Sequence, residues 1–224
     1  MGNQQKGKPK FKRMRKALFF VLVGLCSTMY LDAKSKDFGT WIELEFTKEF
    51  LKDFEFSLIP EIRFEDNFKL DEYMIEGELG YEPFKFLDFS VAYRLGTNVK
   101  NGEDEREQRF ALDVGLENDF DRLEVSLRNR FTKSMESDDE DPGFYYRPRV
   151  KLEYNIKGNK ITPFASYELF RNLDHNEFDK QRFDVGATRE IAKIHRVGIY
   201  YRLQDYIYDR SSIHIVGIEY RLKI

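Results

Sequence analysis

Few side chains in this sequence combine a nucleophile with a base at a spacing that catalysis could use. The chain has three histidines, and His214 lies two residues after Ser212. A serine and a histidine within reach of each other could attack a lipid substrate, but the sequence identifies no third group to orient the base. His175 follows Asp174 in a polar stretch, and His195 lies in a short turn. These residues predict no assembled catalytic site.

Binding motifs are also absent from the sequence. It contains no zinc cluster, phosphate-binding loop or Gly-x-Ser-x-Gly motif. The acidic runs 103–107 and 136–141 could attract Ca²⁺ or Mg²⁺ near lipopolysaccharide, but neither has the ligand spacing of a calcium loop, so we expect solvated loops. We therefore expect no catalytic residue, no metal and no cofactor. A lipid-modifying hydrolase that uses Ser212 and His214 remains an alternative.

The polar residues that remain alternate with apolar ones along most of the chain, and this period of two is the pattern of strands with two unlike faces. Phe54, Phe56 and Leu58, for example, share one face, and Glu55 and Ser57 share the other. Ten segments show the pattern: 54–65, 73–82, 87–96, 109–117, 123–131, 144–156, 161–169, 182–191, 196–204 and 216–224. No helical segment competes with them, so we expect an all-β fold.

The lengths of the strands and of their connections favour an outer-membrane barrel. Strands of about 10 to 13 residues, tilted by about 40°, cover roughly 25–30 Å, which is the thickness of the apolar core of a bilayer. Short turns are expected at 82–86, 118–122, 157–160 and 192–195, and longer loops at 98–107, 133–143, 171–181 and 205–212. Short periplasmic turns and longer extracellular loops are typical of such barrels.

The apolar face is expected to point outward to lipid, because a small barrel has no room inside for so many large side chains. A soluble lipid-binding barrel or sandwich is the alternative. Tyr220, Leu222 and Ile224 alternate up to the last residue and resemble the C-terminal insertion signal of outer-membrane barrels. Residues 40–47 read as an eleventh strand, whereas bacterial single-chain barrels have even numbers of strands. We expect a wall of ten antiparallel strands, with twelve as the second choice.

The first 33 residues are predicted to be a signal peptide. Seven basic residues lie between positions 6 and 16, a short apolar run follows at 17–31, and Ala33 supplies a small residue at the cleavage site. Residues 34–224 would then form the barrel, with 30 basic and 39 acidic residues and a net charge of −9. The only cysteine, Cys26, leaves with the signal peptide, so disulfides are excluded. An uncleaved anchor or lipidation at Cys26 is an alternative.

Several short motifs resemble the DUF2490 family of outer-membrane barrel proteins, which are common in Bacteroidetes. They are PEIRFED (60–66), AYRLG (92–96), RNRF (128–131), RPRVKLEY (147–154), PFASYELF (163–170), QRFDVGATREI (181–191) and YYRL (200–203). The resemblance covers most of the mature chain. It implies a fold and a location in the outer membrane of a Gram-negative bacterium. The family has no settled activity, so it implies no site residue.

If the longer loops are extracellular, arginines and carboxylates on the inward face gather toward the outer mouth of the lumen. We call this predicted set the girdle; its members are Glu61, Arg63, Arg94, Arg109, Asp113, Arg128, Arg130, Arg147, Arg149, Glu153, Glu168, Arg182, Asp184 and Arg202. Paired charges could fill a narrow lumen and hold the wall in shape. They could instead select anions in a channel or small-solute transporter.

The predicted function is therefore a non-enzymatic outer-membrane barrel with a structural or scaffolding role, or a narrow pore. Its expected partners are outer-membrane lipid, lipopolysaccharide and, during insertion, the barrel-assembly machinery. Because the formal net charge of the whole chain is −3 and a general nucleic-acid binder would be basic, we expect no nucleic-acid partner.

Overall fold

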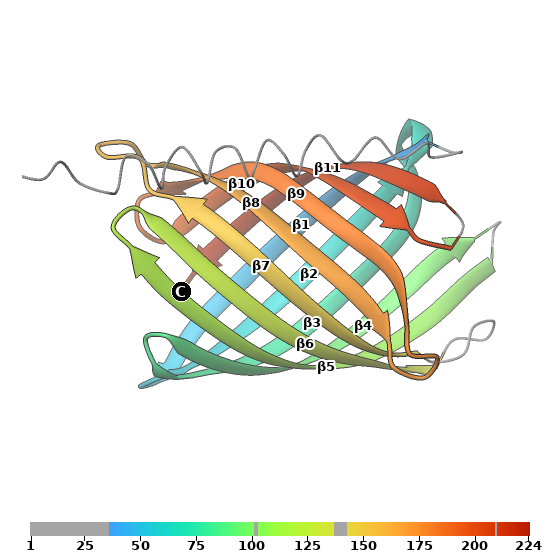
Figure 1. Cartoon of the computed structure of the whole chain (residues 1–224), viewed down its shortest axis with the longest axis horizontal. Helices are drawn as coiled ribbons and strands as arrows, with labels where there is room; N and C mark the ends of the chain where they lie inside the picture. The colour runs from blue at the N-terminus through green and yellow to red at the C-terminus, as the bar shows by residue number, and fades with distance from the viewer. Residues whose placement is uncertain (1–35, 101–102, 137–142, 209) are drawn as a thin grey trace, which may run out of the picture. The chain divides into compact units, whose positions relative to one another are not determined.

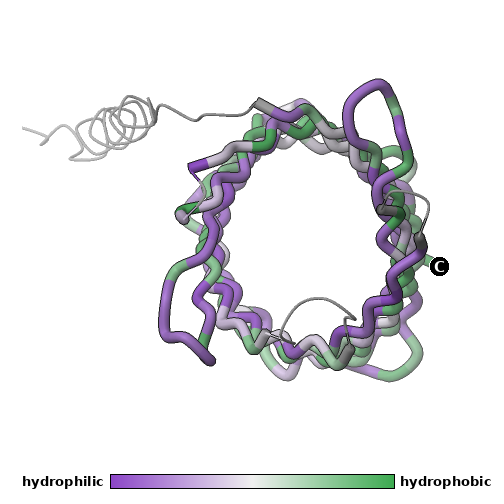
Figure 2. Tube along the Cα trace, turned by 90° about the vertical axis from the view of Figure 1, so that its right-hand side faces the viewer, coloured by the Kyte–Doolittle hydropathy of each residue, from purple (hydrophilic) through white to green (hydrophobic). Residues whose placement is uncertain are grey.

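The chain folds into one closed β-barrel in a computed structural model that describes residues 36–100, 103–136, 143–208 and 210–224. Figure 1 shows the strands crossing the barrel at a steep tilt, and Figure 2, along the barrel axis, shows a single ring. The predicted signal peptide lies outside the described residues. The strands are β1 Lys36–Leu51, β2 Phe54–Glu65, β3 Lys69–Phe84, β4 Leu87–Lys100, β5 Glu103–Phe120, β6 Leu123–Glu136, β7 Phe144–Tyr154, β8 Ile161–Asn172, β9 Glu177–Ile191, β10 His195–Tyr206 and β11 Ser211–Lys223.

The wall has eleven strands, so the expectation of ten or twelve was wrong. Residues 40–47 belong to β1, which is a full strand of the wall and pairs with both β2 and β11. Neighbouring strands are antiparallel except at the closure, where β1 and β11 are parallel. An odd number of up-and-down strands leaves the first and last strands pointing the same way, so a closed ring must contain one parallel pair.

The connections are shorter than predicted, because the strands continue into the segments expected to be loops. β4 extends to Lys100 and β5 starts at Glu103, and only residues 173–176 separate β8 from β9. The acidic run 103–107 therefore lies in β5, and the run 136–141 falls mostly outside the described residues. Several turns place a residue at positive φ, as at Asp53 and Asp121, where a short polar side chain tolerates this backbone.

The barrel has two rims, which we name for the chain ends. The N-terminal rim contains the start of β1 and the connections after β2, β4, β6, β8 and β10. The C-terminal rim contains the end of β11 and the connections after β1, β3, β5, β7 and β9. β1 and β11 are in register from Lys36 opposite Ser212 to Thr47 opposite Lys223. The first and last strands thus begin at one rim and end at the other.

The interior of the barrel is polar, the reverse of a soluble domain. Seven of the buried residues are apolar and seventeen are polar or charged. Large apolar side chains instead cover the outside, where Leu112, Ile199 and Phe89 are 41% to 58% exposed. The alternation of side chains along each strand explains this arrangement. In β1, for example, Ile42, Leu44 and Phe46 face outward, and the residues between them face inward. Soluble monomers rarely expose contiguous apolar surface on this scale.

Candidate functional site

The predicted girdle lines a cavity of about 700 Å³ inside the barrel. Thirteen of its fourteen residues line this cavity. Glu153 is the exception, and it forms an ion pair of 3.0 Å with Lys151, which does line the cavity. Arg94 and Arg130 lie midway along their strands, and Arg147 lies near the N-terminal rim of β7. Most of the girdle thus occupies the middle of the lumen and the half nearer the N-terminal rim.

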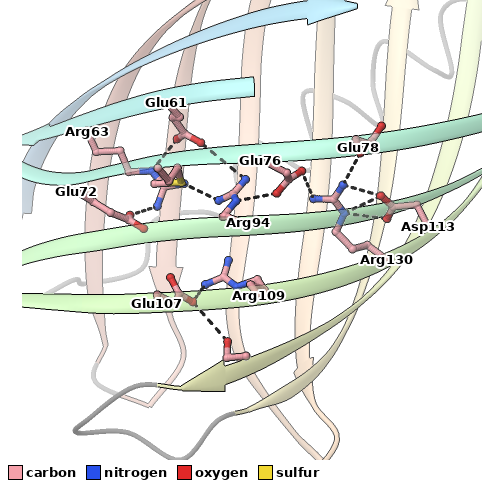
Figure 3. A network of polar contacts seen from close by, with 12 residues as sticks. Glu61, Arg63, Glu72, Glu76, Glu78, Arg94, Glu107, Arg109, Asp113 and Arg130 are labelled. Atoms are coloured by element: carbon pink, nitrogen blue, oxygen red, sulfur yellow. Dashed lines mark hydrogen bonds and ion pairs between the residues drawn. The ribbon is translucent and has the colours of Figure 1, made fainter. Parts of the chain in front are cut away.

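The first part of the girdle is a chain of ion pairs along β2, β3 and β4 (Figure 3). Arg63 on β2 donates to Glu61 at 2.7 Å and also contacts Glu72 on β3. Arg94 on β4 donates through Nε to Glu76 on β3 at 2.7 Å. Each guanidinium thus has a carboxylate on its own or a neighbouring strand. Such charge-assisted bonds fix the side chains in place where the interior leaves little water to compete.

Other ion pairs connect strands that are not neighbours in the ring. Arg130 on β6 donates to Asp113 at 2.8 Å and also reaches Glu76 at 3.6 Å and Glu78 at 3.2 Å, both on β3. Figure 3 shows this guanidinium between its three carboxylates. Arg128 likewise pairs with Glu168 at 2.7 Å, from β6 to β8. A contact between non-neighbouring strands must pass in front of the wall between them, so these side chains occupy part of the lumen.

Several aromatic side chains line the lumen among the charges, and two of them, Trp41 and Phe170, each lie beneath three cations. Trp41 on β1, only 8% exposed, lies under Arg63 at 3.8 Å, measured from Cζ to the ring centroid. Arg202 on β10 and Arg182 on β9 approach the same ring at 4.8 and 5.3 Å. Since β9 and β1 are separated by two strands, Trp41 also helps to fill the lumen. Stacking on an aromatic face suits a guanidinium that is partly desolvated.

Phe170 on β8 is the second ring that lies beneath three cations. It is 4% exposed and carries Arg147, Arg182 and Lys180 at 4.3, 4.6 and 4.8 Å from its ring centroid. Nearby, Glu168 binds Arg128 at 2.7 Å, Arg147 at 3.0 Å and Arg182 at 3.8 Å. Three cations therefore share one carboxylate on this side of the barrel.

The lumen charges are separated between opposite walls. Among the cavity-lining residues of β1–β4, seven are acidic and two are basic: Glu43, Glu45, Glu61, Glu72, Glu76, Glu78 and Asp88 against Arg63 and Arg94. On β6–β9 the ratio is reversed: Arg128, Arg130, Arg147, Arg149, Lys151, Lys180 and Arg182 against Glu168 and Asp184. In a ring of eleven strands, β2 lies across from β7 and β8. We call these the acidic wall and the basic wall.

Sequence reasoning missed several residues of this site, although residue parity could have found them. Trp41, Phe164 and Phe170 are apolar, but each lies an even number of residues from charged or polar inward side chains such as Glu43 and Glu168. The predicted girdle did not include Glu72, Glu76 or Glu78, although Glu76 and Glu78 lie on the polar face of the alternating segment 73–82. Pairing with arginines of other strands depends on closure, which the sequence does not show.

In the structure, the side chains of Ser212 and His214 each form a hydrogen bond with a residue of β10. Ser212 Oγ donates to Asp205 Oδ1 at 2.7 Å, and His214 Nδ1 shares a hydrogen bond of 2.5 Å with the hydroxyl of Tyr201. The backbone N–H of His175 donates to the side chain of Asn172 at 3.2 Å. Over the described ranges, no group of three or more His, Cys, Asp or Glu side chains could hold a metal ion.

The residues of the predicted insertion signal lie at the C-terminal rim. The hydroxyl of Tyr220 shares a hydrogen bond of 2.7 Å with Nδ1 of His195, and the backbone N–H of Ile224 donates to the carbonyl of Thr47 at 2.8 Å. The last residue thus joins the parallel closure to β1, and its side chain is 69% exposed.

One protein-family model matches most of the described chain. The model of a family described as protein of unknown function (DUF2490) matches residues 38–212, which cover β1 to the start of β11. The chain belongs to the DUF2490 family. No curated protein matches this DUF2490 chain significantly. In the part of the chain described here, no helix is long and apolar enough to span a membrane.

Proposed function

We propose that this DUF2490 protein is a non-enzymatic outer-membrane barrel whose lumen is occluded by paired charges, so that it serves a structural or scaffolding role or forms at most a narrow pore. The ion pairs from Arg130 to Glu76 and Glu78 carry the proposal. A wide porin keeps its lumen open to water and solutes, whereas these contacts pass in front of β4 and β5.

The outer surface supports a location in lipid. Outward residues of β5 read Phe110, Leu112, Val114 and Leu116, and three of them are 41% to 46% exposed. The same face of β9 holds Phe183, Val185 and Ala187 between Gln181 and Arg189. Apolar bands bounded by polar residues are what a barrel presents to a bilayer. The outward apolar face and the predicted signal peptide together favour the outer membrane.

Conductance in planar bilayers tests the occlusion. Purified, folded protein should give conductance steps far smaller than those of a sixteen-stranded general porin in the same bilayers. Arg130→Ala removes the side chain that reaches across to β3 and should enlarge the steps. Arg196→Ala is the matched control, because Arg196 also lines the cavity but pairs at 3.2 Å with Glu190 on the neighbouring strand, so this contact does not cross the lumen.

Two results would contradict the proposal. Large, stable steps from the unaltered protein would show an open pore. Recovery of the folded protein in the soluble fraction, with no heat-dependent shift in gel mobility, would contradict a location in the membrane.

A narrow anion-selective channel is the second candidate, and the seven cations of the basic wall favour it. Reversal potentials in a salt gradient would then show a preference for anions.

A further inference from the structure

The basic wall has more positive charge than its own carboxylates can neutralise. Asp184 is held by Arg202 from β10, through two bonds of 2.7 and 2.9 Å. Glu168 therefore remains as the lining carboxylate available to Arg128, Arg147 and Arg182. The surplus carboxylates of the lumen belong to the acidic wall across the barrel.

Two donor atoms on the basic wall lack acceptors. Within the described residues, the Nε atoms of Arg128 and Arg147 are buried and have no hydrogen-bond partner. Arg147 as a whole is 8% exposed. A buried donor without a partner costs free energy, and the cost is larger for a charged group. Both side chains line the cavity, so a ligand that supplies acceptor oxygens there would recover that free energy when the two guanidinium groups turn their Nε atoms toward it.

Two further cations lie beside these donors. The ammonium group of Lys180 lies 4.8 and 5.4 Å from the ring centroids of Phe170 and Tyr206. It therefore contacts aromatic rings at a place where a carboxylate would be the usual partner of an ammonium group. Arg149 lines the cavity two residues from Arg147, on the same inward face of β7. Guanidinium groups bind oxyanions in a fork geometry, and a lysine adds a point charge.

We propose that the lumen holds a small, multivalent oxyanion against the basic wall, bound by Arg128, Arg147, Arg149, Arg182 and Lys180. The cavity of about 700 Å³ has the size of a small-molecule site. Its lining is mostly charged, so the ligand is a soluble polyanion such as a phosphorylated or polycarboxylate solute. An acyl chain would find little apolar surface there. This site goes beyond the structural role proposed above and does not require ion conduction.

Titration calorimetry with inorganic pyrophosphate tests the site in detergent-folded protein at low ionic strength. We expect saturable binding to the unaltered protein, with an affinity that falls as sodium chloride is added. Arg147→Gln and Lys180→Gln should each weaken binding by about tenfold or more, the loss expected for one charge-assisted contact. Arg221→Gln is the control for the change in net charge, because Arg221 lines the same cavity but pairs with Glu45 near the C-terminal rim.

Each outcome has a distinct meaning. Binding that Arg221→Gln weakens as much as Arg147→Gln would overturn the site, because it would reflect net charge alone. No binding to a barrel that shows normal heat-dependent gel mobility would also overturn it. If Arg147→Gln does not fold, Arg149→Gln replaces it in the series. A failed titration leaves the conductance result intact, and a large conductance leaves the titration intact, so the two proposals fail separately.

Discussion

At the scale of single residues, the lumen is held together by cations that stack on aromatic rings as well as by ion pairs. Trp41 is the clearest case, since arginines of three strands meet over its ring. Each such contact is worth about 0.5 to 2 kcal/mol, depending on desolvation. Trp41 thus links β1 to β2, β9 and β10 inside the ring, in addition to the hydrogen bonds of the wall.

Trp41→Ala should lower the free energy of unfolding by about 2 to 4 kcal/mol, because the ring is buried and three guanidinium groups lose their stacking partner. Trp41→Phe should recover part of this loss. Urea unfolding in lipid vesicles, followed by circular dichroism, measures both. The control is Phe86→Ala in the turn after β3, where the ring is 56% exposed. Equal effects of Trp41→Ala and Phe86→Ala would argue against a structural role for Trp41.

At the scale of elements, the parallel pair of β1 and β11 decides the number of strands. Ile42 lies opposite Ile218 in this pair. In a ten-stranded wall without β1, β2 would pair directly with β11, and the closure would be antiparallel. The eleven-stranded ring instead places β1 between them, so β2 and β11 are about 10 Å apart.

Cysteine crosslinking distinguishes the two closures. Ile42→Cys combined with Ile218→Cys should crosslink on mild oxidation or with a short bifunctional reagent. Ile62→Cys combined with Ile218→Cys should not, because a disulfide needs Cα atoms within about 7 Å. Ile62 lies opposite Ile42 on β2, so this pair is the matched control. Gel mobility without reducing agent reports both results. A crosslink between Ile62→Cys and Ile218→Cys alone would contradict the eleven-stranded ring and support a ten-stranded wall.

At the scale of the whole molecule, the barrel is a polar interior wrapped in an apolar surface. If lipid covers that surface, the cost of a charge on it must depend on depth in the bilayer. Leu112 lies midway along β5 and is 46% exposed, and Phe120 ends the same strand at the C-terminal rim and is 55% exposed. Their similar exposure makes them a matched pair for this test.

Leu112→Arg should destabilise the barrel in lipid vesicles by about 2 to 4 kcal/mol, whereas Phe120→Arg should cost about 0 to 1 kcal/mol, because the charge then lies near the interface. Reversible unfolding in urea gives both values. In a soluble barrel, both exposed positions would face water and tolerate arginine equally. Equal costs would therefore contradict the lipid-facing surface.

Much of this architecture follows from the sequence by itself. The period of two assigns each side chain to a face, so the outward apolar residues and thirteen of the fourteen girdle residues at the cavity could be predicted residue by residue. This works because a strand alternates its side chains regardless of its neighbours. The membership in the DUF2490 family was also predicted from motifs spread over most strands.

Only the tertiary structure decided how the ring closes and which charges meet. The lengths of the loops could not be predicted from the sequence, because strands such as β5 continue through polar residues once a neighbouring strand supplies backbone hydrogen bonds. The strand number depended on whether β1 joins β11, which is a contact between the two ends of the fold. The partners of Arg130 on β3, and the separation of acidic and basic walls, depend on the stagger of all eleven strands. These features are set by closure, and alternation within a strand carries no information about it.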